Sequence, residues 1–309
     1  MRRTIVAGLV LLAAAAGRVG AQEPPPSTGE QTAIPFRPLE GSVIINLPSL
    51  DVPREGTLTL LFTHRFRQAV EGTTIHDLFS FDNGADIGIG LAYAPIRNLD
   101  VSFYRSSANR LDPWEFAAKY RVYSNGLFGA ALRVGGNIRS ETGLHDRGSF
   151  FTQAVLAVTI GSRARVTVVP TYVTKIAGAP NAYPADQAPP HDRTCTPLSA
   201  EPGSAVLCSS VYRHVFNAPA ALSIAVTRSI TVHGEVIPRY GKADSGGVGW
   251  SASIEKTLLR HRFCFTAGNQ QATTVDQYAA SLPYLARFLP HGNHAVYLGF
   301  NLVRQWLLK

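Results

Sequence analysis

From Thr57 onward, apolar and polar residues alternate along the chain with a period of two, in segments of about 8 to 13 residues. The stretch 86–93 is the clearest example, since one face takes two Ile, Leu91 and Tyr93 while the other takes Asp, Ala and two Gly. Two Gly and two β-branched Ile disfavour a helix. The stretch therefore predicts a β-strand whose two faces meet different surroundings.

Twelve segments follow this rule, and most of them are separated by turn-forming residues. They cover residues 57–66, 86–94, 99–107, 115–123, 127–138, 150–160, 165–176, 218–227, 230–238, 248–257, 261–268 and 294–306. By these boundaries every second connection is short, about 2 to 4 residues, whereas the others run from about 7 to 41. The short connections include Asn125-Gly126, a pair that favours a type I′ turn. Regular alternation of short and long connections predicts an all-β fold, a closed up-and-down antiparallel transmembrane β-barrel of about 12 strands.

Charged and His residues fall differently on the two faces of these segments. On the apolar faces they lie within three residues of a segment end, as an outer face in lipid requires, because Arg or Lys at mid-membrane costs roughly 2 to 4 kcal/mol. These residues are His64, Arg105, Lys256, His261, His294 and Arg304. The polar faces carry the residues that we expect to line the lumen, namely Lys119, Arg121, Arg133, Glu235, Glu255 and Arg262. A soluble β protein with one buried face is the alternative interpretation.

The N-terminal part of the chain lacks this alternation. Two Arg precede an apolar run of about 14 residues and then small residues, a pattern typical of a secretory signal peptide over residues 1–21. Residues 22–55 begin Pro-rich and are interpreted as an N-terminal segment before the barrel domain, residues 56–309. Within this segment, the apolar stretch Val43–Leu47 fits an extra strand, a plug piece or a packed turn.

Composition fits an exported protein. Only 16% of the residues are charged, against roughly 25% in an average protein. The formal net charge is +8, and removal of the three Arg in residues 1–21 leaves 26 basic and 21 acidic residues, a net charge of +5. The remaining Lys and Arg form no run, which argues against a nucleic-acid partner. The expected partners are outer-membrane lipid and the barrel-assembly machinery.

Several short motifs resemble those of an uncharacterised family of bacterial outer-membrane β-barrel proteins, a domain of unknown function. They are Thr63-His64-Arg65-Phe66, the run 77–91, Lys119-Tyr120-Arg121, and the shorter runs 253–256 and 297–302. The resemblance spans roughly residues 57–306 and implies a barrel in the bacterial outer membrane, with no established activity or site residues to carry over. The chain departs from the usual pattern in its long 177–217 connection and in its last residues, Trp306-Leu307-Leu308-Lys309, which lack a terminal aromatic residue.

Cysteine usage fits the same compartment. Cys195 and Cys208 lie 13 positions apart in the longest expected outside loop, and in an oxidising environment this spacing predicts a disulfide. A metal site of these two residues with His191 is the alternative, but its spacing matches no zinc pattern, so no metal is expected. Cys264 lies on a lumenal position of its strand and is interpreted as unpaired.

Motifs of known catalytic chemistry are missing from the sequence. The run 249–253 lacks the second Gly of a nucleophile elbow, and Gly88-Ile89-Gly90 does not continue into a phosphate-binding loop. We therefore expect neither an enzyme nor a cofactor. An outer-membrane lipase is the weaker alternative. The His residues available to it are His64, His76, His233 and His261.

The expected lumen has charges of opposite sign on opposite sides. In a closed barrel of twelve strands, Lys119, Arg121 and Arg133 would form a basic wall nearly opposite Glu235 and Glu255. The two walls either act on polar solutes in an open lumen or pair across a filled one. The first interpretation predicts a passive or gated channel for small polar solutes. The alternative is a non-conducting structural or adhesive barrel that binds through the 177–217 loop.

Overall fold

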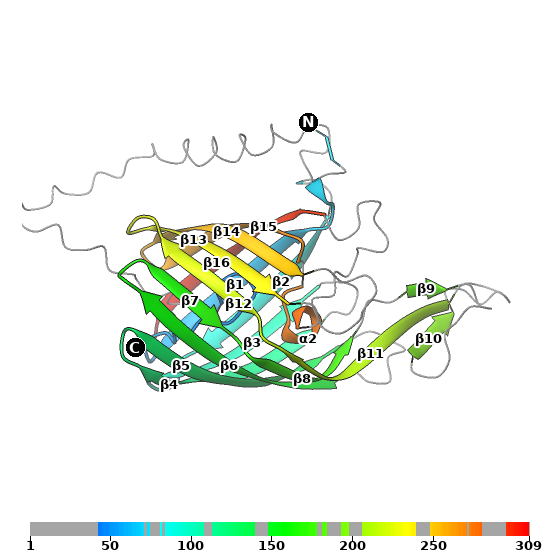
Figure 1. The fold of residues 1–309 in the computed structure, drawn as a ribbon, viewed down its shortest axis with the longest axis horizontal. Helices are drawn as coiled ribbons and strands as arrows, with labels where there is room; N and C mark the ends of the chain where they lie inside the picture. The colour runs from blue at the N-terminus through cyan, green and yellow to red at the C-terminus, as the bar shows by residue number, and fades with distance from the viewer. Residues whose placement is uncertain are drawn as a thin grey trace, which may run out of the picture. The chain divides into compact units, whose positions relative to one another are not determined.

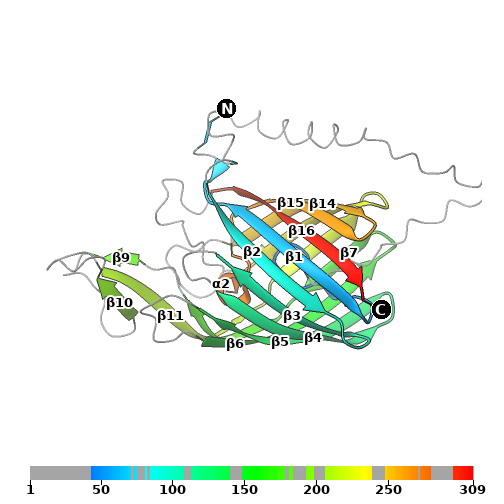
Figure 2. The same cartoon turned by 180° about the vertical axis from the view of Figure 1, so that it is seen from behind.

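The computed structural model describes residues 43–70, 73–74, 81, 84–107, 113–139, 148–177, 181–183, 193–197, 206–238, 248–270, 272–279 and 295–308. These residues belong to one compact unit, residues 34–309. In this part of the chain, twelve antiparallel strands close into a barrel (Figures 1 and 2), which confirms the predicted fold class. The expected signal peptide, residues 1–21, lies outside the described residues.

The strands follow one another around the wall in chain order, and β1 pairs with β16 to close the sheet. Their bounds are β1 Thr57–Phe66, β2 Ala85–Tyr93, β3 Leu99–Ser106, β4 Trp114–Ser124, β5 Phe128–Ile138, β6 Gly148–Ile160, β7 Ala164–Val168, β8 Thr171–Ala177, β11 Val206–Asn217, β12 Ala220–Ala225, β13 Ile230–Ile237, β14 Gly249–Leu258, β15 His261–Gly268 and β16 Tyr297–Leu307. β7 pairs with β12, and β8 pairs with β11. β7 and β8 therefore together form one strand of the barrel, and β11 and β12 together form the strand beside it.

Proline interrupts both of these composite strands. Pro170 separates β7 from β8, and Pro219 lies just before β12. Proline has no N–H to donate to a sheet ladder, but its carbonyl still accepts. Ala154 N donates to Pro170 O at 2.9 Å, and Val169 N donates to Pro219 O at 2.8 Å. The wall therefore stays continuous across the two interruptions.

Burial alternates along the strands as the sequence pattern predicts. On β2, Ile89 and Leu91 are 52% and 46% exposed, whereas the intervening Gly88 and Gly90 are buried. On β14, Trp250 and Ile254 face outward while Glu255 is 1% exposed. A barrel in lipid requires this arrangement, with apolar side chains outside and polar side chains inside.

The expected 177–217 loop contains strands. β9 (Asn181–Tyr183) and β10 (Arg193–Pro197) both pair with β11, and Figure 1 shows these strands extending beyond the barrel wall. The prediction that the eighth strand begins at residue 218 was therefore wrong. On β11, His214 has a φ of 57°, and the pair it would form with Thr174 is missing from a register between β11 and β8 that otherwise continues unshifted.

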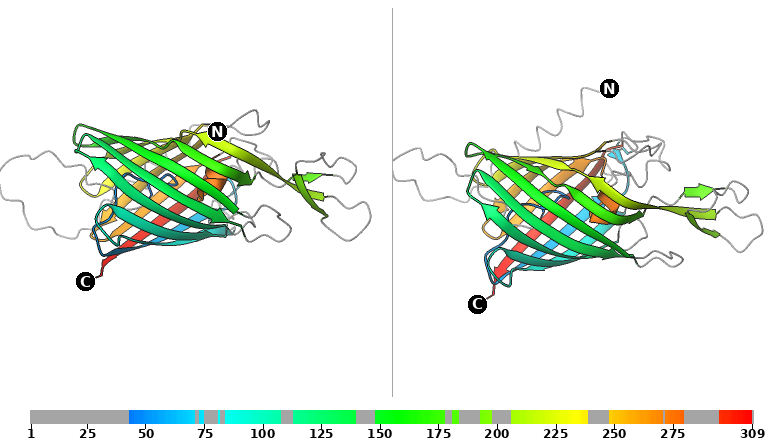
Figure 3. Two further views of the ribbon diagram at one scale, coloured as in Figure 1. Left: turned by 90° about the horizontal axis from the view of Figure 1, so that it is seen from below. Right: turned by 60° about the horizontal axis from the view of Figure 1, so that its bottom comes forward.

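The hydrophobic core lies inside the barrel. It joins residues from the wall, such as Phe151 and Val173, with Ile45 and Leu47 from before β1 and Tyr278 from α2 (Val275–Tyr278). Figure 3 shows α2, in orange, within the barrel at the end from which β11 extends. No helix among the described residues is long and apolar enough to cross a membrane.

Candidate functional site

Residues 43–52, here called the plug, fill part of the lumen. Ile44 N donates to Leu47 O at 2.8 Å, which folds the segment into a tight turn. Ile45 and Leu47 are 2% and 0% exposed. Of the three interpretations open for this apolar stretch, the structure shows a packed turn that also acts as a plug piece inside the barrel.

One carboxylate in the wall holds the tip of the plug. Glu235 on β13 accepts hydrogen bonds from the backbone N–H groups of Ile45, Asn46 and Leu47 at 2.8, 3.0 and 3.0 Å. The Asn46 side chain also donates to Glu235 Oε2 at 3.2 Å. Three consecutive N–H groups that converge on one anion form a strong, charge-assisted arrangement.

Strands β1 and β16, which are neighbours in the wall, hold the same turn of the plug from another side. Arg65 on β1 donates to Asn46 Oδ1 at 3.1 Å and to Asn301 Oδ1 at 2.8 Å. Asn301 on β16 in turn donates to Ile45 O at 2.8 Å. Every contact in this group is polar and comes from the inner face of the barrel.

The other end of the plug lies against the basic side of the lumen. Lys119 on β4 donates from Nζ to Ser49 O at 3.1 Å and to Asp51 O at 2.8 Å. Arg165 on β7 forms an ion pair with the Asp51 carboxylate at 2.5 Å. Lys119 and Glu235 therefore bind the two ends of one segment that crosses the lumen.

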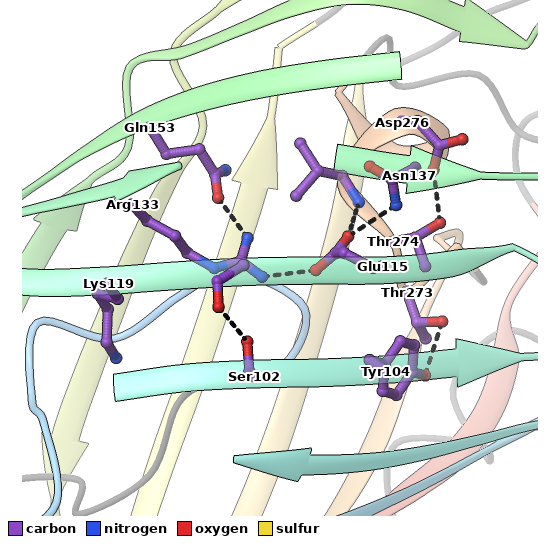
Figure 4. Close-up of polar contacts among 12 residues, drawn as sticks. Ser102, Tyr104, Glu115, Lys119, Arg133, Asn137, Gln153, Thr273, Thr274 and Asp276 are labelled. Carbon is purple, nitrogen blue, oxygen red and sulfur yellow. Dashed lines mark hydrogen bonds and ion pairs between the residues drawn. The ribbon is translucent and has the colours of Figure 1, made fainter. Parts of the chain in front are cut away.

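The remaining expected lumen residues pair within the wall. Arg133 on β5 binds Glu115 on β4 and Gln153 on β6 (Figure 4). Arg262 on β15 pairs with Glu255 on β14. Because these partners lie on adjacent strands, the pairs join the wall without crossing the lumen.

Arg121 lies near the end of β4, beside the short turn after β2. Its Nε and Nη2 both donate to Asn98 Oδ1, at 3.2 and 2.7 Å. It differs from Arg133 and Arg262 in that its hydrogen-bond partner is a neutral amide. Among the described residues, no carboxylate forms an ion pair with Arg121.

A Ser, a His and a Glu meet on three adjacent strands. Ser223 Oγ and His233 Nδ1 are 2.8 Å apart, and His233 Nε2 lies 3.7 Å from Glu255 Oε2. This is the only His of the four lipase candidates with such neighbours among the residues whose contacts are described. All three side chains are 1% exposed, so a substrate has no access to the Ser223 hydroxyl in this structure.

Residues 272–279, here called the α2 segment, fill a second part of the lumen (Figure 4). Glu115 Oε2 accepts from Val275 N at 2.8 Å, and Arg139 pairs with Asp276 at 2.9 Å. Tyr278 Oη accepts from Gln153 Nε2 at 3.0 Å, and burial raises the pKa of this phenol, so that it stays neutral. These partners lie on β4 to β6 and at the end of β5, on one side of the barrel.

A small cavity remains between the plug and the α2 segment. Its volume is about 50 Å³, and its lining includes Asp100, Glu115 and Lys119. Asp100 Oδ2 lies 3.9 Å from Lys119 Nζ, while its Oδ1 is buried without a hydrogen-bond partner. Such a space holds a few water molecules. Between the plug and the α2 segment, the described residues therefore leave room for water alone.

Metal chemistry receives no support from the described part of the chain, where no group of three or more His, Cys, Asp and Glu is arranged to hold an ion. The register places Cys195 opposite Cys208 on β10 and β11. The side chains of these two residues, like the whole of His76 and His191, lie outside the described structure. The disulfide stays a prediction.

Several residues that hold the plug were not expected from the sequence. They are Asn46, Asp51, Arg65, Arg165 and Asn301. Arg65, Arg165 and Asn301 lie on polar faces of their strands, so alternation alone would have placed them in the lumen. Asn46 and Asp51 precede the barrel, and no local pattern indicates their partners.

Most of the chain matches one known protein family. Residues 39–306 match the family described as "Membrane bound beta barrel domain (DUF5777)". The chain belongs to this family. The match begins before β1 and so includes the plug as well as the barrel. With its closed wall and apolar outer face, this family member is a β-barrel of the bacterial outer membrane.

Solved outer-membrane barrels are similar in fold. The NanC porin is 7% identical with a TM-score of 0.45, over 81% of this chain and 100% of the porin. An outer membrane channel from Pseudomonas putida F1 is 10% identical with a TM-score of 0.43, over 83% of this chain and 97% of the channel. Outer membrane phospholipase A from Escherichia coli is 11% identical with a TM-score of 0.37, over 80% and 89%. These similarities say nothing about the activity of this chain. No curated protein matches it.

Proposed function

We propose that this family member is a gated channel for small polar solutes, with the plug as its gate and the structure in its closed state. The observation that carries the proposal is the chemistry between plug and wall. Glu235, Lys119 and Arg65 hold the plug through hydrogen bonds to its backbone and to Asn46. Water can replace these polar contacts when the plug leaves, whereas the buried side chains of Ile45 and Leu47 favour the closed state.

The size of the lumen supports a gate over a permanently open pore. A cavity of about 50 Å³ between the plug and α2 admits water but no solute of several heavy atoms. The interior of an eight-strand barrel is filled by the side chains of its own wall, whereas a sixteen-strand barrel encloses a channel. A twelve-strand barrel lies between them, so its wall encloses a space that other parts of the chain can fill. The plug occupies this space.

The α2 segment leaves a route once the plug is gone. Its contacts come from β3 to β6, from the end of β5 and from Asn217 on β11. The tip of the plug lies on the other side, against β13, β16 and β1. Departure of the plug would expose Glu235 and Lys119 to the lumen, and their opposite charges would then act on passing solutes.

The test is the conductance of purified protein in a planar lipid bilayer. We expect the wild-type chain to be nearly silent and Glu235→Gln to show frequent openings. In this variant the three plug N–H groups that bind Glu235 would donate to a neutral acceptor. A hydrogen bond to a charged group stabilises by roughly 1.5 to 3 kcal/mol, and one to a neutral group by about 1 kcal/mol. Even a partial loss shifts the closed-to-open ratio by an order of magnitude or more.

Glu255→Gln is the matched control, because Glu255 has the same 1% exposure on the adjacent strand but pairs with Arg262 and does not touch the plug. It should remain as silent as the wild-type chain. Equal conductance of the two variants would contradict a gating role for Glu235. Silence of Glu235→Gln together with a chain that lacks the plug would contradict the channel itself.

The arm of β9, β10 and β11 favours a second candidate function, a non-conducting adhesive barrel. β10 and β9 pair with β11 beyond the wall, where a partner could bind. A chain lacking residues 180–205 separates the two candidates. If this deletion abolishes cell attachment, and no plug variant of the full chain conducts, the result favours adhesion. If the deletion leaves plug-dependent conductance unchanged, the result favours the channel.

A further inference from the structure

A larger cavity lies at the end of the barrel where the short turns are. Its volume is about 210 Å³, and it is lined by Ser124 and Gly126 of the β4–β5 turn and by Leu50 and Asp51 of the plug. Both Arg121 and Arg165 also line it. Leu50 and Asp51, here called the foot of the plug, thus line a space large enough for a small organic molecule.

The lining of this cavity contains two guanidinium groups and one carboxylate, that of Asp51. Arg165 pairs with Asp51 at 2.5 Å, and Arg121 donates to the neutral amide oxygen of Asn98. With both Arg charged and Asp51 ionised, the lining carries a net charge of +1. A planar guanidinium presents N–H donors in a fork that matches the oxygens of a carboxylate or phosphate. The described lining therefore has one guanidinium more than it has carboxylates.

We propose that this cavity binds a small oxyanion, a carboxylate or phosphate group, between Arg121 and Arg165. The oxyanion would compete with Asp51 for Arg165. Since Asp51 also offers its backbone carbonyl to Lys119, loss of its ion pair loosens the foot of the plug. The consequence for opening rests on the gated channel proposed above, but the binding itself does not.

Isothermal titration calorimetry of the folded, detergent-solubilised protein tests the binding without any measurement of current. The probes are acetate, inorganic phosphate and, as a neutral isostere of acetate, acetamide. We expect heat from acetate, phosphate or both and none from acetamide. A response to acetate alone assigns the site to carboxylates, and a response to phosphate alone assigns it to phosphates.

Four variants define the site. Arg121→Gln should weaken binding roughly tenfold or more, because a charge-assisted pair is lost, and Arg121→Lys, which keeps the charge without the fork, should weaken it less. Asp51→Asn should strengthen binding, because it removes the competing carboxylate. Arg67→Gln, at the opposite end of β1 and paired with Asp86, should leave binding unchanged. Native-like folding is checked by heat-modifiable electrophoretic mobility.

Three results would overturn the inference: no heat from either oxyanion, wild-type affinity in both Arg121 variants, or weaker binding in Asp51→Asn. Each differs from failure of the channel. If the plug gates a current but no oxyanion binds, the channel stands and this site does not. If an oxyanion binds as predicted and no plug variant conducts, the site stands and the channel does not.

Discussion

Gly129 on β5 shows how closely single residues fit around the plug. A Cβ at this position would collide with Leu50 Cδ2 of the plug, and Leu50 is 4% exposed. Gly129 has no positive φ that would require glycine, so space alone decides the residue. The wall is therefore shaped to the plug as well as charged for it.

We predict that Gly129→Ala lowers the free energy of unfolding through this collision, by about 1 to 3 kcal/mol. Leu50→Ala alone should cost about 2 to 5 kcal/mol, because it leaves a cavity. The double variant should be more stable than the sum of the two costs predicts, since the smaller plug residue makes room for the new methyl group. Urea unfolding from lipid vesicles, followed by tryptophan fluorescence, measures these free energies. Strict additivity would show that the two residues do not touch.

The sequence predicts the side of each lumenal residue but not its partner. Alternation alone places Lys119, Arg133 and Glu235 on the inner face. The contact of Glu235 with Ile45 joins positions 190 residues apart, and no local pattern carries that information. The expected pairing of opposite walls is replaced by two separate contacts to the plug. Charge alone therefore left open whether the lumen is open or filled, and it did not identify the segment that the lumenal charges hold.

At the scale of elements, a buried ion pair fixes the α2 segment to the wall. Arg139 and Asp276 are 1% and 0% exposed, and Thr274 Oγ1 donates to Asp276 Oδ1 at 2.8 Å. Removal of one partner from such a pair leaves a buried charge uncompensated. The α2 segment is thus held, like the plug, by both an ion pair and a backbone N–H that donates to a carboxylate of the wall.

We predict that Arg139→Met lowers the free energy of unfolding by about 3 to 5 kcal/mol, the cost typical of breaking a buried pair. Arg67→Met is the control, because Arg67 also pairs with an aspartate but is 53% exposed, and its loss should cost at most about 1 kcal/mol. Equal losses in the two variants would contradict the role given to Arg139.

Strand boundaries were predictable wherever the period of two is unbroken. β1 and β15 begin and end at the expected residues, 57–66 and 261–268. The prediction failed along β11, whose first part has Ser and Cys beside apolar residues. A loop that folds into a strand outside the membrane has no lipid-facing side, and so it lacks the alternation that reveals barrel strands.

The expected disulfide belongs to this outer arm. Because Cys195 and Cys208 are directly opposite in the β10–β11 register, we predict that they are oxidised in the mature protein. Mass spectrometry of peptides before and after reduction should show one linked pair that contains both residues. Two alkylated free thiols in protein recovered from the outer membrane without reductant would contradict it.

At the scale of the whole molecule, the barrel and the segment before it form one structure. The family match includes residues 39–56 as well as the strands, and the core of the lumen contains side chains of the plug. The earlier division at residue 56 thus separates two parts that pack against each other. A twelve-strand wall encloses more space than its own side chains fill, and the plug and α2 occupy the remainder.

The conductance of a chain without residues 43–52 tests this account most directly. In planar bilayers the full chain should give almost no current, and the shortened chain should give steady unitary steps. A second shortened chain, without residues 272–279 but with the plug in place, should stay silent, because the plug alone crosses to β13. Two results would contradict the claim that residues 43–52 close the lumen. One is a chain without these residues that folds as a barrel and still gives no current. The other is a full chain that conducts as well as the chain without the plug.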